Sequence, residues 1–305
     1  MGRYIIRRII QMIPVFFLLT LIIFGVTRLR GDPTFQFVQA DASQEEIDAV
    51  RRAYGFDRPI YEQYLIFLAG AVRGDFGESF RYRQDAMGLV LERMPATLTL
   101  TAAALVISWL IALPTGLISA LRQNSAIDLA ATGISVIGRA MPNYWMGIMF
   151  ILLFGVQLRW LPVSGTGDWR HLVLPATTLG LGIATTLTRL IRSSMLEVIR
   201  QEYITTARAK GLSEWAVIMR HALRNSMISV VTIFGLQVGW LLGGAVIVEQ
   251  VFAWPGMGRL MLQAVYNRDL AVMQAGVFVS ALIIMVLNLI VDISYTLLDP
   301  RIRYN

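Results

Sequence analysis

Long apolar blocks alternate with polar segments along this chain, and the pattern predicts helices that span a membrane. A bilayer core about 30 Å thick needs about 20 apolar residues per helix. Six blocks come close to this length or exceed it: Ile9–Val26, Leu98–Ile118, Met141–Leu158, Leu172–Leu190, Ile228–Val251 and Val272–Leu298. The first block is long for a signal peptide, and no Ala-x-Ala-like cleavage site precedes Arg28. We therefore expect it to be a retained helix.

The largest polar region, residues 28–93, is predicted to fold as helices outside the membrane. Ser43 and Glu46 have the spacing of a capping box, and Gly55 follows as a helix stop. A second helix is predicted to begin near Pro59. The expected organisation is a first span over 1–27, this helical loop, a five-helix domain over 94–299 and a tail over 300–305. Two interpretations of the loop stay open: a cap without a specific task, or a docking surface for an outside partner.

Positive charge gathers in segments that would share one side of the membrane. With the N-terminus inside, the arginines at 3, 7 and 8, those between positions 192 and 224, and those at 301 and 303 are all cytoplasmic. Cytoplasmic loops carry an excess of Lys and Arg. This rule accounts for the net charge of +7 without nucleic acid, and it places both termini in the cytoplasm of a bacterial inner membrane.

Composition excludes several other classes of protein and of functional site. The chain of 305 residues is 56% hydrophobic and only 15% charged, too little charge to cover a soluble domain of this size. It has no cysteine, so disulfides, thiolate nucleophiles and Cys-ligated metals are excluded. The two histidines, His171 and His221, fall on opposite sides in this topology, which argues against a metal site.

Enzyme signatures are missing or weak. The single lysine, Lys210, stands in Ala-Lys-Gly, so the chain has no phosphate-binding G-x-x-x-x-G-K-[ST] loop. Neither H-E-x-x-H nor G-x-S-x-G occurs. Gly165-Thr166-Gly167-Asp168 resembles the G-x-G-D motif of intramembrane aspartyl proteases, but its partner would be Asp292, near the opposite face. We expect no catalytic residues, no metal and no cofactor in this chain.

Ionisable residues near the predicted spans are expected to have hydrogen-bond or ion-pair partners, because a charge that faces lipid is costly. For Asp292 we expect a structural ion pair with Arg189 or Arg192; a direct role toward a substrate is the alternative. Glu249, near the outer end of the fifth span, is expected to bond a neighbouring loop, to gate a pathway or to sit at the interface.

One polar segment between the fourth and fifth blocks has a distinct pattern. The segment Gln201–Trp215 predicts a short helix that ends before Gly211, with Ser213 capping the next helix. Small residues give this helix a slim profile that suits insertion into a groove of another protein. A solvated linker whose basic face touches anionic lipid is the alternative.

The same segment resembles the cytoplasmic coupling loop of ABC importer permeases. Thr205, Thr206 and Ala207 stand at the small positions of that motif, Gly211 at its glycine and Leu223 at its distal leucine. Thr205 replaces the initial Glu of the general motif. The resemblance covers nearly the whole chain and is specific for the dipeptide, oligopeptide and nickel branch, in its B-type with a long outer loop. It rests on Gly31-Asp32-Pro33, Tyr54 to Pro59, Gly74 to Gly77, Trp160-Leu161-Pro162, Glu249 to Gly258 and Asp299-Pro300-Arg301.

Two short segments are similar to the glutathione importers within this branch. One position departs from the pattern of the branch. Phe252 to Pro255 and Arg301 to Tyr304 are similar to the glutathione-importer permeases. Ser229 stands where the branch has a proline, which leaves the direction of the fifth span open.

The resemblance implies a type I ABC importer permease fold in an all-α polytopic protein with six spans. It implies a paralogous permease, two ATPases that bind ATP and Mg, a periplasmic or lipid-anchored solute-binding protein, and membrane lipid around the chain. The implied docking helix is 203–212: Tyr203, Thr205, Thr206, Ala207, Arg208, Ala209, Lys210, Gly211 and Leu212. An outer gate or pathway is expected at Glu249, Phe252, Pro255, Gly256 and Gly258.

The cargo is open at this point. Peptides, including di- and oligopeptides or glutathione, are expected, with nickel or another small solute as the alternative. From a different class, a secondary transporter would work without an ATPase and would need broken helices with ion ligands at the middle of the membrane.

Overall fold

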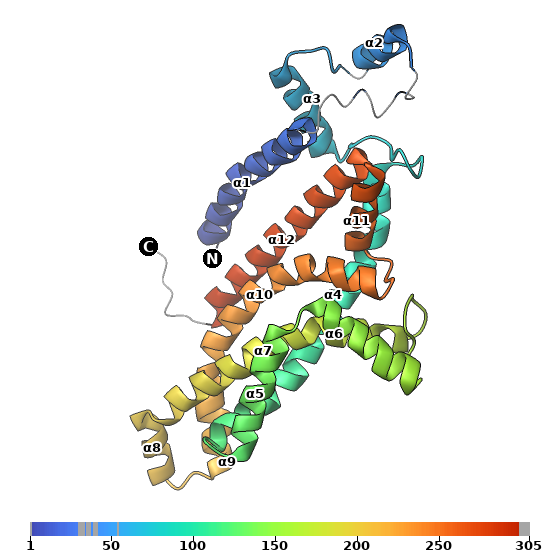
Figure 1. Cartoon of the computed structure of the whole chain (residues 1–305). Helices are drawn as coiled ribbons and strands as arrows, with labels where there is room; N and C mark the ends of the chain where they lie inside the picture. The colour runs from blue at the N-terminus through green and yellow to red at the C-terminus, as the bar shows by residue number, and fades with distance from the viewer. Residues whose placement is uncertain (1, 30–33, 35–37, 39–41, 54, 299–305) are drawn as a thin grey trace. The chain divides into compact units, whose positions relative to one another are not determined.

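The computed structural model describes residues 2–29, 34, 38, 42–53 and 55–298, without the side chains at 2–5, 29, 228, 236, 238, 240, 292 and 294–298. Gly31-Asp32-Pro33, Tyr54 and the tail from Asp299 lie outside these residues. The chain divides into two compact units (Figure 1). The first joins Met1–Glu92 to Leu260–Met285, and the second joins Arg93–Arg259 to Val286–Asn305.

Four helices are long and apolar enough to cross a membrane. They are α1 (Gly2–Leu29), α4 (Ala86–Leu121), α7 (Arg170–Ile199) and α12 (Leu270–Leu298). The helix α10 (Arg224–Val251) covers the fifth predicted block, and its described apolar part is Leu241–Val251. Among the described residues the structure therefore confirms four spans, and the count of six stays a prediction.

The third predicted block, Met141–Leu158, is not a straight span of its own. It is one arm of a bent pair: α5 (Ala126–Ala140) meets α6 (Asn143–Phe150) and its π-helical continuation η2 (Ile151–Gln157) at 107°. Pro142 explains the break, because a proline lacks the N–H that would continue α5 and disfavours helical geometry at Met141. Helix α5 was not predicted, because the polar residues at its N-terminus are typical of a loop. If the pair counts as one span, the described spans number five.

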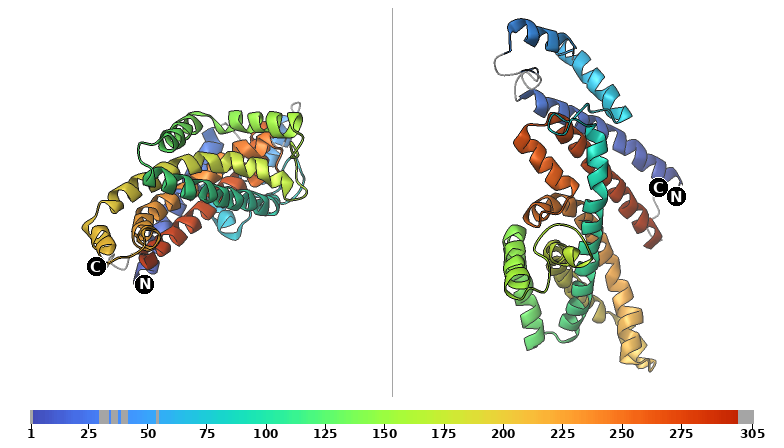
Figure 2. Two further views of the ribbon diagram at one scale, coloured as in Figure 1. Left: turned by 90° about the horizontal axis from the view of Figure 1, so that it is seen from below. Right: turned by 90° about the vertical axis from the view of Figure 1, so that its right-hand side faces the viewer.

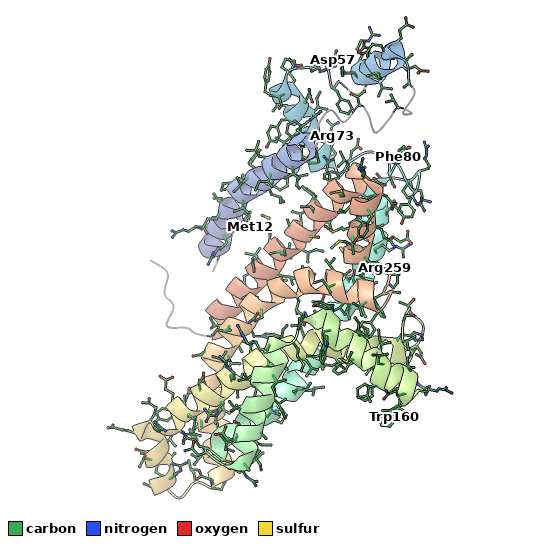
Figure 3. The ribbon with its side chains drawn as sticks, viewed as in Figure 1. Met12, Asp57, Arg73, Phe80, Trp160 and Arg259 are labelled. Atoms are coloured by element: carbon green, nitrogen blue, oxygen red, sulfur yellow. The ribbon has the colours of Figure 1, made fainter. Side chains whose placement is uncertain are left out.

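Aromatic rings hold the first unit together. Phe24 of α1 lies 5.5 Å from the Tyr64 ring and 5.8 Å from the Phe67 ring of α3 (Ile60–Arg73). Phe278 of α12 packs on Phe16 at 5.6 Å and on Phe76 at 5.1 Å. Such offset and edge contacts between rings stabilise the unit beyond the burial of their apolar surface. Along α1 many apolar side chains still point outward (Figure 3), as expected for a helix in lipid.

The predicted local signals of the loop are confirmed. In the capping box before α2 (Gln44–Ala53), the Ser43 N–H donates to Glu46 Oε2 at 2.9 Å and the Glu46 N–H donates to Ser43 Oγ at 3.3 Å. Helix α3 begins directly after Pro59. Further along, Asp269 precedes α12 and accepts a 2.5 Å hydrogen bond from Ser79, which ties the loop to that helix.

The second unit is built around α7. This helix packs against α5, α6 and α10, which the views of Figure 2 also show. In the apolar stretch of α7, 61% of the residues are buried, whereas in that of α4 the share is 33%. Beyond α7 the chain forms α8 (Glu202–Ala209), α9 (Glu214–Ala216) and the π-helical η3 (Val217–Leu223), which leads into α10. A last helix, α11 (Met257–Asn267), follows α10.

Close packing of α7 on α4 depends on Gly180. A Cβ atom at this position would lie 2.6 Å from the carbonyl oxygen of Ala104, far inside van der Waals contact. A side chain there would therefore push the two helix backbones apart. Small residues at helix contacts are a general device of membrane bundles.

We expect Gly180→Ala to destabilise the detergent-solubilised protein by about 1–3 kcal/mol, because overpacking forces the backbones to shift. Gly133→Ala on α5 is the matched control, since a Cβ there meets nothing within 4 Å. The control should be neutral or slightly stabilising, because alanine favours helix more than glycine does. Thermal unfolding measures both, and equal effects would contradict the Gly180 contact.

Candidate functional site

The predicted docking helix is present as α8, which ends close to the predicted stop. It runs from Glu202 to Ala209, and Lys210 is its C-cap. Gly211 has φ +77°, a left-handed conformation that other residues adopt only with strain. Ser213 then caps α9 by accepting the N–H of Ala216 at 3.4 Å. Leu212 lies in the turn, just beyond the helix. Figure 1 shows α8 and α9 together at the end of α7 and α10.

The two faces of α8 differ. Ile204 and Ala207 are buried at 0% and 7% exposure and seat the helix on its own chain. Tyr203 and Leu212 are exposed, and so is Trp215 of α9, at 71%. Thr205, Thr206, Arg208, Ala209 and Lys210 are exposed as well. Ala207 thus belongs to the inner face, while the other predicted docking residues are accessible to a partner.

Polar contacts fix the shape of this surface. Arg208 donates two hydrogen bonds to Glu214, at 2.6 and 3.1 Å, across the turn that follows α8. These bonds hold the pKa of the exposed Glu214 carboxyl below its usual value. The Tyr203 hydroxyl accepts a 3.0 Å bond from Asn225 at the start of α10. The surface is therefore presented in one defined geometry.

A second cluster, the carboxylate latch, joins α4 to the end of α10 and the first turn of α11. It consists of Thr97, Glu249, Met257 and Arg259. The Thr97 hydroxyl donates to Glu249 Oε1 at 2.5 Å and accepts the N–H of Met257 at 2.8 Å. Glu249 Oε2 accepts the N–H of Arg259 at 2.9 Å. The latch satisfies free N–H groups of the first turn of α11.

The predicted gate residues lie in and around this latch, packed in the protein. Glu249 is fully buried, and Phe252 is 2% exposed. At Gly256 a Cβ would lie 2.1 Å from Glu249 Oε1, so only glycine lets the carboxylate reach the turn. Gly258 is buried and Pro255 half-buried. The Glu249 side chain bonds Thr97 of α4 and the Arg259 N–H of α11, which are helix residues, and its expected role in a gate stays a prediction.

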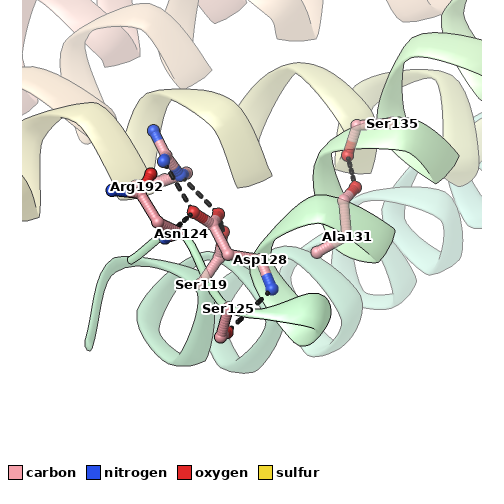
Figure 4. Close-up of polar contacts among 7 residues, drawn as sticks. All are labelled: Ser119, Asn124, Ser125, Asp128, Ala131, Ser135 and Arg192. Carbon is pink, nitrogen blue, oxygen red and sulfur yellow. Dashed lines mark hydrogen bonds and ion pairs between the residues drawn. The ribbon is translucent and has the colours of Figure 1, made fainter. Parts of the chain in front are cut away.

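A third cluster is an ion pair that the sequence analysis did not foresee (Figure 4). Asp128, near the start of α5, accepts hydrogen bonds from Arg192 Nε at 2.7 Å and Arg192 Nη2 at 2.8 Å. Its carboxylate also accepts from the Ser119 hydroxyl and from the Asn124 N–H. Asp128 is 2% exposed, so the pair clamps the α4–α5 turn to α7 with its charge enclosed.

This pair revises the expected partner of Arg192. The prediction named Asp292, but in the structure Arg192 binds Asp128. The side chain of Asp292 lies outside the described residues. No hydrogen bond or ion pair joins Arg189 to any described residue, and its predicted pairing with Asp292 stays a prediction. The signal for Asp128 was available in Ser125-x-x-Asp128, a helix-start spacing.

Neither protease chemistry nor a metal centre is supported by the described residues. Asp168 lies in an exposed loop, where Asp168 Oδ1 and His171 Nδ1 are 3.0 Å apart. This contact with His171 lowers the pKa of Asp168, so the carboxyl is ionised and held by its local turn. Among the described residues, no group of three metal-ligating side chains lies together.

Comparisons with known families cover nearly all of the chain. The family described as the inner membrane component of binding-protein-dependent transport systems matches residues 112–304. The N-terminal family of the membrane components of these systems matches residues 1–101.

Curated relatives match over their full length. The glutathione transport system permease protein GsiC of Escherichia coli (strain K12) is 39% identical over 305 residues, which is 100% of both chains. GsiC of Shigella flexneri serotype 5b is also 39% identical over the same length.

Solved structures share the fold. The chain is similar to an inward-facing MetNI methionine ABC transporter, with a TM-score of 0.59 and 20% identity over 70% of this chain and 97% of that one. It is also similar to an amino acid ABC transporter, with a TM-score of 0.52 and 17% identity over 70% of this chain and 94% of that one. The predicted type I permease fold is therefore confirmed.

We expect Thr97→Val to destabilise the protein by about 1–3 kcal/mol, because it leaves the buried Met257 N–H without an acceptor and Glu249 Oε1 without its donor. Thr99→Val on the same helix is the control. Thr99 is exposed and bonds only the Pro95 carbonyl of its own helix, so about 0.5 kcal/mol or less is expected. Chemical unfolding in detergent measures both variants, and a harmless Thr97→Val would refute the latch.

We expect Arg192→Met to be more destabilising than the double variant Arg192→Met/Asp128→Asn. The single change leaves a buried carboxylate unpaired, at a cost of about 3–5 kcal/mol, whereas the double change removes the charge as well. Arg189→Met, three residues away with no described partner, should be nearly neutral. A double-mutant cycle by unfolding in detergent checks the order of the three variants, and additive effects would count against the clamp.

Proposed function

Because this chain belongs to the family of inner membrane components of binding-protein-dependent transport systems, we propose that it is a permease subunit of an ATP-driven importer for peptides of the glutathione type. It performs no covalent chemistry itself, and ATP and Mg are bound by the ATPase subunits. The cargo assignment is supported by the full-length identity to the glutathione permease GsiC. Di- and oligopeptides are the neighbouring cargo class.

One observation carries the coupling role. Helix α8 is anchored on its own chain through Ile204 and Ala207. Tyr203 of α8, Leu212 of the turn after it and Trp215 of α9 are left uncovered. Large exposed apolar groups on a short, fixed helix suit insertion into a groove of another protein. The partner that fits is the ATPase, because an importer must transmit the ATPase cycle to the membrane. Lys210 then serves on a docking surface and not in a phosphate site.

The transport step is a change between two states of the bundle. When the ATPases bind ATP they close and push α8, and the push passes into α7 and α10, which flank it in the chain. Arg192 passes the movement to the α4–α5 turn through Asp128. A nucleotide drives such a change only through its different affinity for the two states.

The remaining partners follow from the same proposal. A paralogous permease completes the pathway, and a periplasmic or lipid-anchored binding protein delivers the cargo from outside. In this arrangement α8 and both termini face the cytoplasm, and residues 28–93 lie outside. Affinity purification from the native host, with mass spectrometry, should recover a second permease and ATPases that carry phosphate-binding loops. Recovery of the chain alone, with uptake that needs no ATP, would overturn the proposal in favour of a secondary transporter.

We expect Gly211→Arg to abolish co-purification of the ATPase and ATP-driven uptake while the chain still inserts into the membrane. The Arg would project beside α8 into the contact surface. Gly165→Arg is the matched control, because both glycines have positive φ, +77° and +83°, and a Cβ at either meets nothing within 4 Å. The backbone strain is thus the same, and only the location differs. Loss of the ATPase from both variants would show that strain, not docking, is responsible.

A further inference from the structure

A basic pocket in the second unit is used by neither α8 nor the latch. It has a volume of about 480 Å³ and lies between α5, α7 and α10. Its wall combines two arginines, three hydroxyl side chains and three apolar ones: Arg189, Arg192, Thr132, Thr186, Ser193, Val136, Leu190 and Ile233. No carboxylate is among these lining residues.

The charge of this pocket is only partly neutralised. Arg192 is paired with Asp128, but Arg189 is exposed and has no hydrogen-bond or ion-pair partner among the described residues. At the rim, Arg139 Nη1 donates a 3.1 Å bond to Thr186 Oγ1. Because that oxygen accepts from Arg139, the Thr186 hydroxyl hydrogen is free to point toward a bound anion. Among the described residues, the guanidinium groups of Arg189 and Arg139 thus have no carboxylate partner, and Thr186 offers a hydroxyl donor to the pocket.

These groups form a series along α7. Arg192 follows Thr186 by six positions, which is about 9 Å along a helix. Arg189 lies between them, and Arg139 meets Thr186 from α5. The basic groups therefore extend from the α4–α5 turn into the bundle, over a part of the chain that composition places in the membrane. An unpaired arginine at such depth faces water or protein, because facing lipid is costly.

We propose that this pocket is an anion subsite of the translocation pathway, in which Arg189, Arg139 and Thr186 take up a carboxylate of the passing solute. The inference rests on the proposed importer function and adds a solute class, because a positive field favours solutes of net negative charge. Glutathione fits this class, with two carboxylates and one ammonium group at neutral pH. The same guanidinium groups could instead hold the phosphate of a lipid headgroup, and the experiments separate these two sources.

The first experiment probes the pocket directly in the assembled importer. The chain has no cysteine, so single cysteines introduced at Thr132 or Val136 can be followed without background. We expect both to react with water-soluble thiosulfonates, and the anionic reagent to be faster than the cationic one. Adding Arg189→Gln should lower this preference about fivefold, as expected for the loss of one nearby charge. Lack of reaction, or equal rates with both reagents, would overturn the proposal whatever the cargo is.

The second experiment tests the solute in proteoliposomes of neutral lipid, with glutathione and an uncharged tripeptide compared in one complex. We expect Arg189→Gln to slow glutathione uptake about fivefold, while the tripeptide stays within about twofold and the stimulation of ATPase activity by the binding protein persists. Arg122→Gln, an exposed arginine of the α4–α5 turn outside the pocket, should leave both rates unchanged. Equal loss for both solutes would overturn the subsite.

Two further outcomes separate the alternatives. If the effect of Arg189→Gln appears only when anionic lipid is added, and is then equal for both solutes, the pocket holds a lipid headgroup and the proposal is wrong. If the wild-type complex imports neither solute with ATP, the proposed function fails. In that case the thiosulfonate rates still decide whether the pocket is an aqueous basic site.

Discussion

The burial of α7 is the constraint on which the rest of the second unit depends. Helices α5, α6 and α10 all pack on it, and Gly180 lets α4 come within backbone contact. Because α7 is enclosed, its polar residues must meet protein or water, and they do so as the Arg192 clamp and the basic pocket. Its end leads directly into α8. One helix therefore connects α8, the clamp and the pocket.

Local signals in the sequence were sufficient wherever a few neighbouring residues decide the structure. The capping box at Ser43, the start of α3 after Pro59 and the stop at Gly211 were all predicted, because each depends on backbone geometry within one turn. The four confirmed spans followed from apolar length. The bend before α6 was missed, although Pro142 marks it, because the apolar block that contains Pro142 was interpreted as one straight span.

Contacts between distant residues could not be predicted in the same way. Asp292 stands in an apolar block and therefore needed a partner, and Arg189 or Arg192 was predicted for it. Asp128 stands in a polar stretch and looks solvated in the sequence, yet it is buried because the α4–α5 turn folds it against α7. For Glu249 the sequence indicated a bond to a loop but not Thr97. Pairing across 64 or 152 positions is decided by tertiary packing, which a single sequence does not record.

The carboxylate latch also has a consequence for the order in which the protein is made. Thr97 is synthesised 152 residues before Glu249, and the N–H groups of Met257 and Arg259 follow later still. Helix α4 must therefore enter the membrane with its Thr97 hydroxyl bonded elsewhere, as Thr101 is to a carbonyl of its own helix. Thr97 is already present when Glu249 is made, but the donor to Glu249 Oε2 is added only when the ribosome has passed Arg259. The latch is thus complete only late in synthesis, because a chain that stops before Met257 lacks the N–H groups of Met257 and Arg259.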